Sequence, residues 1–255
     1  LISFLASVIG CICGIGGGVI IKPIMDAFHM YSVSTISFMS GCIVLSMTAY
    51  SVIKTQLSHE SVIEKGSSTW LGIGAALGGI AGKQLFDIIK TASENPDAVG
   101  AVQAAALFAL TLATIIYTVN KSKIKTHSIT SGAVCAVIGL ALGMMSSFLG
   151  IGGGPINLVV LYFFFSMDTK TAAQNSLYII LISQLVSLLF TIVTGAVPEF
   201  PALLLGVMIL CGILGGVVGR KINKKIDNAA VDKLFIGLLT VIMFVCVYNY
   251  MQFSR

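Results

Sequence analysis

A run of five residues, Gly14-Ile15-Gly16-Gly17-Gly18, returns 136 positions later as Gly150-Ile151-Gly152-Gly153-Gly154. Each copy lies in a long uncharged segment, and consecutive glycines interrupt a helix there because glycine costs about 1 kcal/mol relative to alanine. A helix that begins after such a turn presents unpaired N–H groups and a partial positive charge. Anions bind readily at helix starts, and glycine lets the backbone approach a ligand closely. The two motifs therefore predict an anion-binding site.

The glycines predicted to bind this anion are the last three of each motif. The helices after the motifs are expected to begin at about Val19 and Pro155, where a proline suits the first helical position. The alternative is that the glycines only allow helices to pack closely, although a packing motif needs no consecutive glycines. The predicted ligands are Gly16, Gly17, Gly18, Gly152, Gly153 and Gly154.

Three other residues near these turns could act on an anion. Lys22 lies one turn into the first short helix, within an apolar stretch long enough to lie inside a membrane. An ionisable residue in such a position is by default a candidate functional residue. Asp26 lies four residues later on the same side and is a candidate proton carrier. The two charges could instead only neutralise each other near the membrane surface. Asn157, two positions after Pro155, is a further candidate hydrogen-bond donor.

The composition predicts an all-α, polytopic membrane protein. Of the 255 residues, 56% are hydrophobic and only 10% are charged, against roughly 25% in a soluble domain. The net charge of +5 comes from lysines in short loops, which is a topology signal and not a sign of nucleic-acid binding. The chain begins with Leu1, so we expect native residues before it. Single crossings are expected at about 33–53, 67–86, 99–119, 171–194, 201–219 and 234–251.

The run before and after each glycine motif is too long for one crossing. Residues 128–167 would span about 60 Å as a helix, twice the hydrocarbon core of about 30 Å. We therefore expect a hairpin, with one helix over about 131–149, a glycine turn, and a returning helix over 155–167. The first motif predicts the same hairpin around Gly14 to Gly18.

The chain is expected to consist of two copies of one unit, a common construction for transporters. The same shift aligns Ser40 with Ser176, and one more residue of shift aligns Lys83 with Arg220. The copies are residues 1–120 and 128–255, joined by a basic linker at 121–127. Each copy contains a glycine-broken hairpin and three crossings, so the second must be inverted relative to the first.

Charge supports this topology. With hairpins, eleven of the fifteen basic residues lie on one side of the membrane, whereas single crossings would divide them nine to six. Because basic residues favour the cytoplasmic side, the linker is predicted to be cytoplasmic and both termini outside. We expect a multi-pass protein of a bacterial inner membrane.

Several features together resemble the TauE/SafE family of sulfite and organosulfonate permeases across nearly the whole chain. They are the first glycine motif with Pro23 downstream, the second with Pro155, the polar clusters near Ser40 and at Gln174-Asn175-Ser176, and helices with Gly-x-x-x-Gly spacing. The resemblance implies transport of a small sulfur-containing anion. One departure is Phe38-Met39-Ser40, where the family usually has small residues.

This resemblance implies a secondary transporter whose substrate lies between the two glycine hairpins. Ser40, Gln174, Asn175 and Ser176 could donate hydrogen bonds to sulfonyl oxygens, or could simply bridge helices. The expected partners are the anion and the lipid bilayer, with a homodimer left open and no nucleic acid. We expect no cofactor, metal or catalytic residues. The alternatives are a permease or channel for another small anion such as a carboxylate, and a membrane-embedded enzyme.

Overall fold

The computed structural model describes residues 1–27, 31–58, 61–92, 96–149 and 153–253, and this part of the chain is helical. The helices begin and end within a few residues of the expected positions, except that several crossings extend by a turn or more into polar flanks. Their bounds are α1 (Ile2–Cys13), α2 (Gly18–Ala27), α3 (Val33–Leu57), α4 (Lys65–Ala92), α5 (Pro96–Asn120), α6 (Gly132–Phe148), α7 (Gly154–Phe165), α8 (Thr169–Val193), α9 (Ala202–Lys225) and α10 (Asn228–Phe253).

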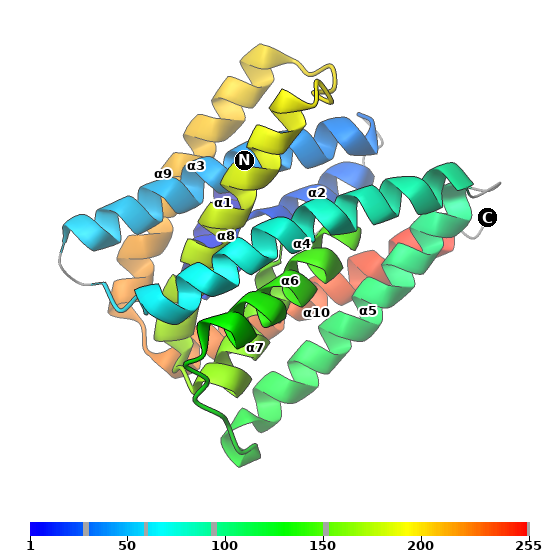
Figure 1. Cartoon of the computed structure of the whole chain (residues 1–255). Helices are drawn as coiled ribbons and strands as arrows, with labels where there is room; N and C mark the ends of the chain where they lie inside the picture. The colour runs from blue at the N-terminus through cyan, green and yellow to red at the C-terminus, as the bar shows by residue number, and fades with distance from the viewer. Residues whose placement is uncertain (28–30, 59–60, 93–95, 150–152, 254–255) are drawn as a thin grey trace.

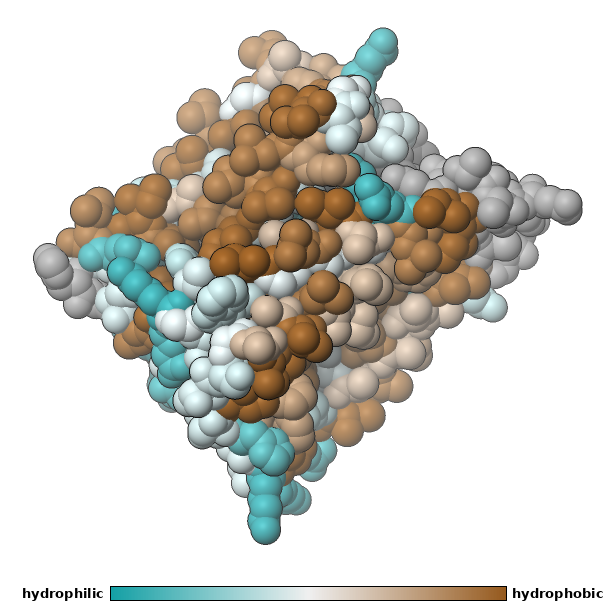
Figure 2. All heavy atoms as spheres, viewed as in Figure 1, coloured by the Kyte–Doolittle hydropathy of each residue, from teal (hydrophilic) through white to brown (hydrophobic). Residues whose placement is uncertain are grey.

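Five helices of the described chain are long and apolar enough to cross a membrane: α3, α5, α8, α9 and α10. The sixth expected crossing, α4, is as long, but its many glycine and hydroxyl residues make it less apolar. Large hydrophobic side chains such as Leu203, Val193 and Phe244 are exposed, as a lipid-facing surface requires. Figure 2 shows hydrophobic side chains over much of one face, with hydrophilic ones gathered toward its corners.

Glycine faces hold two pairs of helices close together. Figure 1 shows α4 and α6 side by side across the middle of the molecule. A Cβ added at Gly78 of α4 would overlap the backbone carbonyl of Leu140, and one at Gly143 of α6 would overlap that of Ala75. The Gly-x-x-x-Gly helices are therefore packing faces, as their spacing predicts.

The second close pair joins α1 to α9. A Cβ at Gly215 would lie 2.6 Å from the carbonyl oxygen of Phe4, and one at Gly219 would lie 2.5 Å from that of Val8. In the sequence alignment of the two halves, α1 corresponds to α6 and α9 corresponds to α4. Thus the first helix of each half packs against a later helix of the other half.

The remaining helices enclose these pairs. The helix α5 packs against α10, while α8 contacts both α3 and α4. One core cluster contains Ile12 of α1, Leu161 of α7 and Phe235 of α10, all nearly fully buried. Separate hydrophobic clusters such as this one, together with the glycine faces, thus hold the helices of the described chain.

Polar contacts fix the linker at one end of the molecule. The Lys121 Nζ lies 2.7 Å from the Asp232 carboxylate of α10 and donates a hydrogen bond of 2.8 Å to Thr169 Oγ1 of α8. Asp232 Oδ1 also accepts a hydrogen bond from Thr169. The end of α5 and the starts of α8 and α10 therefore lie together, beside the linker.

Candidate substrate cavity

A cavity of about 300 Å³ lies between helices of both halves, in the part of α8 far from the linker. Its walls come from α2, α3, α4, α5, α6 and α8, from the turn between α1 and α2, and from the connection between α8 and α9. The lining residues are Ile15, Gly18, Lys22, Ser34, Ser37, Phe38, Ser40, Gly41, Val44, Lys83, Phe86, Gln103, Ser146, Ser147, Gln184, Ser187, Thr191, Ala196 and Pro198.

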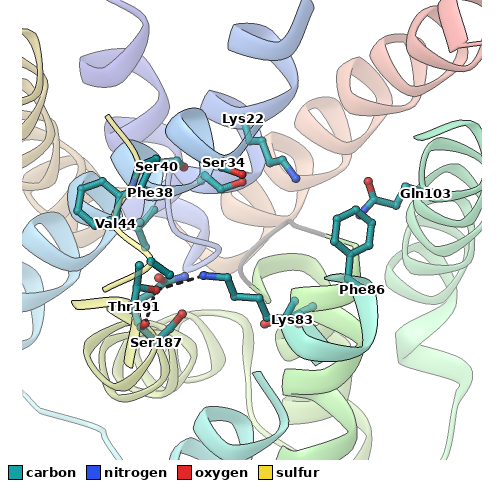
Figure 3. Close-up of a pocket in the computed structure, with 18 of the residues that line it drawn as sticks. Lys22, Ser34, Phe38, Ser40, Val44, Lys83, Phe86, Gln103, Ser187 and Thr191 are labelled. Atoms are coloured by element: carbon teal, nitrogen blue, oxygen red, sulfur yellow. Dashed lines mark hydrogen bonds between the residues drawn. The ribbon is translucent and has the colours of Figure 1, made fainter. Parts of the chain in front are cut away.

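Positively charged side chains line the cavity. Two lysines line it, Lys22 from α2 and Lys83 from α4, and the described lining residues include no Asp or Glu. Lys83 Nζ donates a hydrogen bond of 3.2 Å to Thr191 Oγ1 of α8. In Figure 3 both lysine side chains extend toward the space between these helices. Since low-dielectric walls strengthen the field of a charge, such a cavity favours an anion over a cation.

A smaller recess of about 40 Å³ shares four lining residues with this cavity: Ser146, Ser147, Gln184 and Ser187. It also includes Gly153 and Asn157, so it extends the cavity toward the start of α7. We call it the α7 recess. Its walls carry hydroxyl and amide groups without charge, and these are suitable donors for anionic oxygens.

The geometry of the α7 recess depends on Gly153. This residue precedes α7 with φ 96°, a left-handed conformation that side chains other than glycine rarely adopt. A Cβ there would lie 3.3 Å from the Asn157 Nδ2 and 3.4 Å from the Ser146 Oγ. Ser146 Oγ is buried without a hydrogen-bond partner in the described structure. An unpaired hydroxyl thus faces the start of a helix. An oxyanion bound there would accept hydrogen bonds from the Ser146 hydroxyl and from the first N–H groups of α7.

The first glycine motif reaches the same region. Gly18 lines the cavity, and a Cβ on it would lie 3.3 Å from Ser40 Oγ and 3.1 Å from a methyl carbon of Val44. A Cβ on Gly154 would overlap the carbonyl oxygen of Ile15, so the two motifs are in direct contact. The duplicated motifs meet between the two halves, and the cavity adjoins this contact.

Most of the predicted ligands of the first half lie around the cavity. Gly18, Lys22 and Ser40 line it, whereas Gly16 and Gly17 belong to the adjoining turn and are buried. In the second half, Gly153 and Asn157 line the α7 recess and Gly154 begins α7. Gly152 lies outside the described residues. Asp26 is in the last turn of α2, but its side chain is likewise outside the described part of the structure.

The structure does not bring Gln174, Asn175 and Ser176 to this cavity. Asn175 is fully buried, its Oδ1 accepts hydrogen bonds from Glu64 N and Ser68 Oγ, and its Nδ2 donates to Val62 O and Thr171 O. It thereby ties α8 to the segment before α4. Ser176 is buried as well, and Gln174 lines a separate small pocket near Arg220. A ligand role for these three residues is still only a prediction.

Several lining residues were not predicted as ligands from the sequence, notably Lys83, Gln103, Gln184 and Thr191. Lys83 directly follows the glycines of the α4 packing face. A usable signal was present, because Lys83 lies within a glycine-rich apolar stretch and aligns with the cationic Arg220 of the other half. Gln184 gave a similar signal, since it is a polar residue in the middle of the apolar helix α8.

Comparison with known proteins supports a transport role. Neither the curated proteins nor the solved structures include a match to this chain. The family model described as sulfite exporter TauE/SafE matches residues 1–245, which is nearly all of the sequence. The members of this family are membrane transporters and not enzymes. The chain is therefore a multi-pass membrane protein that belongs to the sulfite exporter TauE/SafE family.

Proposed function

We propose that the chain is a secondary transporter that binds sulfite or a small organosulfonate in the cavity of about 300 Å³ between the two halves, which we call the central cavity. The observation that carries this proposal is the pair Lys22 and Lys83 in a cavity whose described lining contains no carboxylate. The anionic oxygens would lie toward the α7 recess, where Ser146, Asn157 and Gln184 offer neutral donors. Hydrogen bonds of this kind orient an anion, while the lysines supply the attraction.

Two inverted repeats with glycine hairpins form the structural part of the proposal. Two backbone hydrogen bonds support the second hairpin, from His127 N to Phe163 O at 2.8 Å and from Ile129 N to Phe164 O at 3.0 Å. They join the segment before α6 to the end of α7, so these two helix ends lie at the same side. The first helix of each half packs against a helix of the other half, α1 on α9 and α6 on α4, and this matching arrangement supports the repeat.

The substrate can be tested by thermal unfolding of the purified protein with sulfite, thiosulfate, sulfate, sulfonates or carboxylates, each at equal ionic strength. A ligand at 100 times its Kd stabilises a protein by about 2.7 kcal/mol, or roughly 5–10 °C for this size. We expect that rise with sulfite or a sulfonate and none with chloride. Equal stabilisation by a carboxylate would instead favour a carboxylate permease, and no stabilisation by any anion would contradict the cavity assignment.

The orientation in the membrane is a further part of the proposal, with the linker in the cytoplasm. Basic residues from different elements lie at the linker end: Lys121 of the linker contacts α10, and Arg220 in the last turns of α9 donates a hydrogen bond to Ser58 at the end of α3. A cysteine at the exposed Ser122 should not react with a membrane-impermeant thiol reagent in intact cells, but should react after lysis. Labelling in intact cells would place the linker outside and refute this orientation.

A further inference from the structure

A second, much smaller pocket lies at the linker end of the molecule and has no role in the binding site described above. It has a volume of about 50 Å³, against about 300 Å³ for the central cavity. The start of α8 and the ends of α1, α3 and α9 form it. Its walls include Cys11, Ser51, Thr55, Gln174, Arg220 and Asn223. We call it the linker-end pocket.

The linker-end pocket is built from the same positions of the repeat as the central cavity. Shifting the sequence by 136 residues, or by 137 around Arg220, places eight of its nine lining residues onto residues that line the cavity. The pairs that matter most are Cys11 with Ser147, Thr55 with Thr191, and Arg220 with Lys83. Two pockets of one repeat thus differ about sixfold in volume.

One hydrogen bond is repeated in both pockets. Arg220 Nε donates to Thr55 Oγ1 at 3.1 Å, and its counterpart Lys83 Nζ donates to Thr191 Oγ1 at 3.2 Å. Arg220 makes additional hydrogen bonds: its Nη2 donates to Ser58 Oγ at 2.6 Å and to Lys54 O at 3.4 Å. A guanidinium has several donors in a rigid plane, so Arg220 ties α9 to the end of α3 more firmly than one amine could.

We propose that the linker-end pocket is the closed form of a vestibule equivalent to the central cavity, and that Arg220 keeps it closed. Release of Arg220 from Thr55 and Ser58 opens this vestibule, while the halves close around Lys83 and Thr191 on the other side. The anion then passes from one pocket to the other across the contact between the glycine motifs. The proposal rests on the proposed transport function, but it does not depend on which anion is carried.

Cys11 and its counterpart allow a direct test. Cys11 lines the linker-end pocket, and Ser147 lines the central cavity at the corresponding position. The test uses a full-length chain in which the other five cysteines are alanine and Cys11 is kept, with a matched chain that carries Cys11→Ser and Ser147→Cys. A membrane-impermeant thiol reagent is added to vesicles on the linker side for Cys11 and on the opposite side for Ser147→Cys.

We expect Arg220→Ala to label Cys11 about tenfold faster, since loss of a charge-assisted hydrogen bond shifts a two-state equilibrium by at least that factor. Labelling of Ser147→Cys should slow only by the share of molecules that moves to the other state, and it should not become faster. Thr55→Val removes only the hydroxyl that accepts the hydrogen bond from Arg220, and it should change the labelling rates in the same direction as Arg220→Ala. Lys221→Ala changes the neighbouring exposed lysine and should leave both rates unchanged.

Unchanged labelling of Cys11 in both Arg220→Ala and Thr55→Val would overturn the proposal. So would faster labelling of both Cys11 and Ser147→Cys in the same variant, because alternate opening cannot raise the accessibility of both pockets. If Arg220→Ala does not give a folded protein, Thr55→Val decides the outcome. None of these measurements contains sulfite, so a negative result here is distinct from a failure to bind the proposed substrate.

Discussion

Replacing Lys83 by glutamine is expected to weaken sulfite binding about 30-fold, which corresponds to about 2 kcal/mol. Lys83 is one of two lysines that line the central cavity, and its Nζ is held there by Thr191. Glutamine keeps a hydrogen-bond donor and most of the side-chain length, so the change removes mainly the charge. Titration calorimetry with the purified protein measures this loss directly.

Two further variants separate charge from other effects of the Lys83 substitution. Lys83→Arg keeps the positive charge and should bind within a few-fold of the parent. Lys65→Gln removes an exposed lysine at the start of α4, outside the cavity lining, and should not change the affinity. Equal affinity of Lys83→Gln and the parent protein would show that the cavity does not hold the anion.

Replacing Gly143 by leucine is expected to destabilise the folded protein by about 3 kcal/mol or more, because overpacking against a rigid backbone cannot be relieved locally. A Cβ at this position would overlap the backbone carbonyl of Ala75, and α4 carries its own glycines against α6. The two helices would have to separate, with loss of contacts along their length. We expect a melting temperature lower by about 10 °C, or no monodisperse protein in detergent.

The matched control for this prediction is Gly206→Leu in α9. Gly206 also lies inside a helix, so both substitutions gain the same intrinsic helix propensity. However, a Cβ at Gly206 would meet no atom within 4 Å. This variant should therefore be as stable as the parent protein, and an equal loss of stability in the two variants would contradict the packing argument.

The helix positions were largely predictable because membrane insertion imposes simple rules on sequence. Uncharged runs gave the crossings, and the length of residues 128–167 required a break where the structure has α6 end at Phe148 and α7 begin at Gly154. The role of glycines such as Gly78 in packing followed from their spacing. These features depend on local composition, and local composition is what a single sequence contains.

The ligands were less predictable because a polar residue in an apolar helix can either bind a substrate or hydrogen-bond to a neighbouring segment of the protein. Asn175 and Lys83 are both polar residues in long helices, yet Asn175 has all its hydrogen bonds made by neighbouring backbone and Ser68, whereas Lys83 lines the cavity. Which use applies depends on the rotation of each helix and on the helix packed against it. Neither is determined by the spacing of residues along one helix.

The duplicated glycine motif, together with the helices on either side, is thus the feature that the sequence by itself determined most clearly. Only the tertiary structure decided that the two motifs touch, that the cavity lies beside them toward Lys83 and Gln184, and that the equivalent pocket at Arg220 is small. The physical reason is that a repeat sequence specifies equivalent contacts for both halves, while the packing of the halves against each other determines which of the two pockets is open.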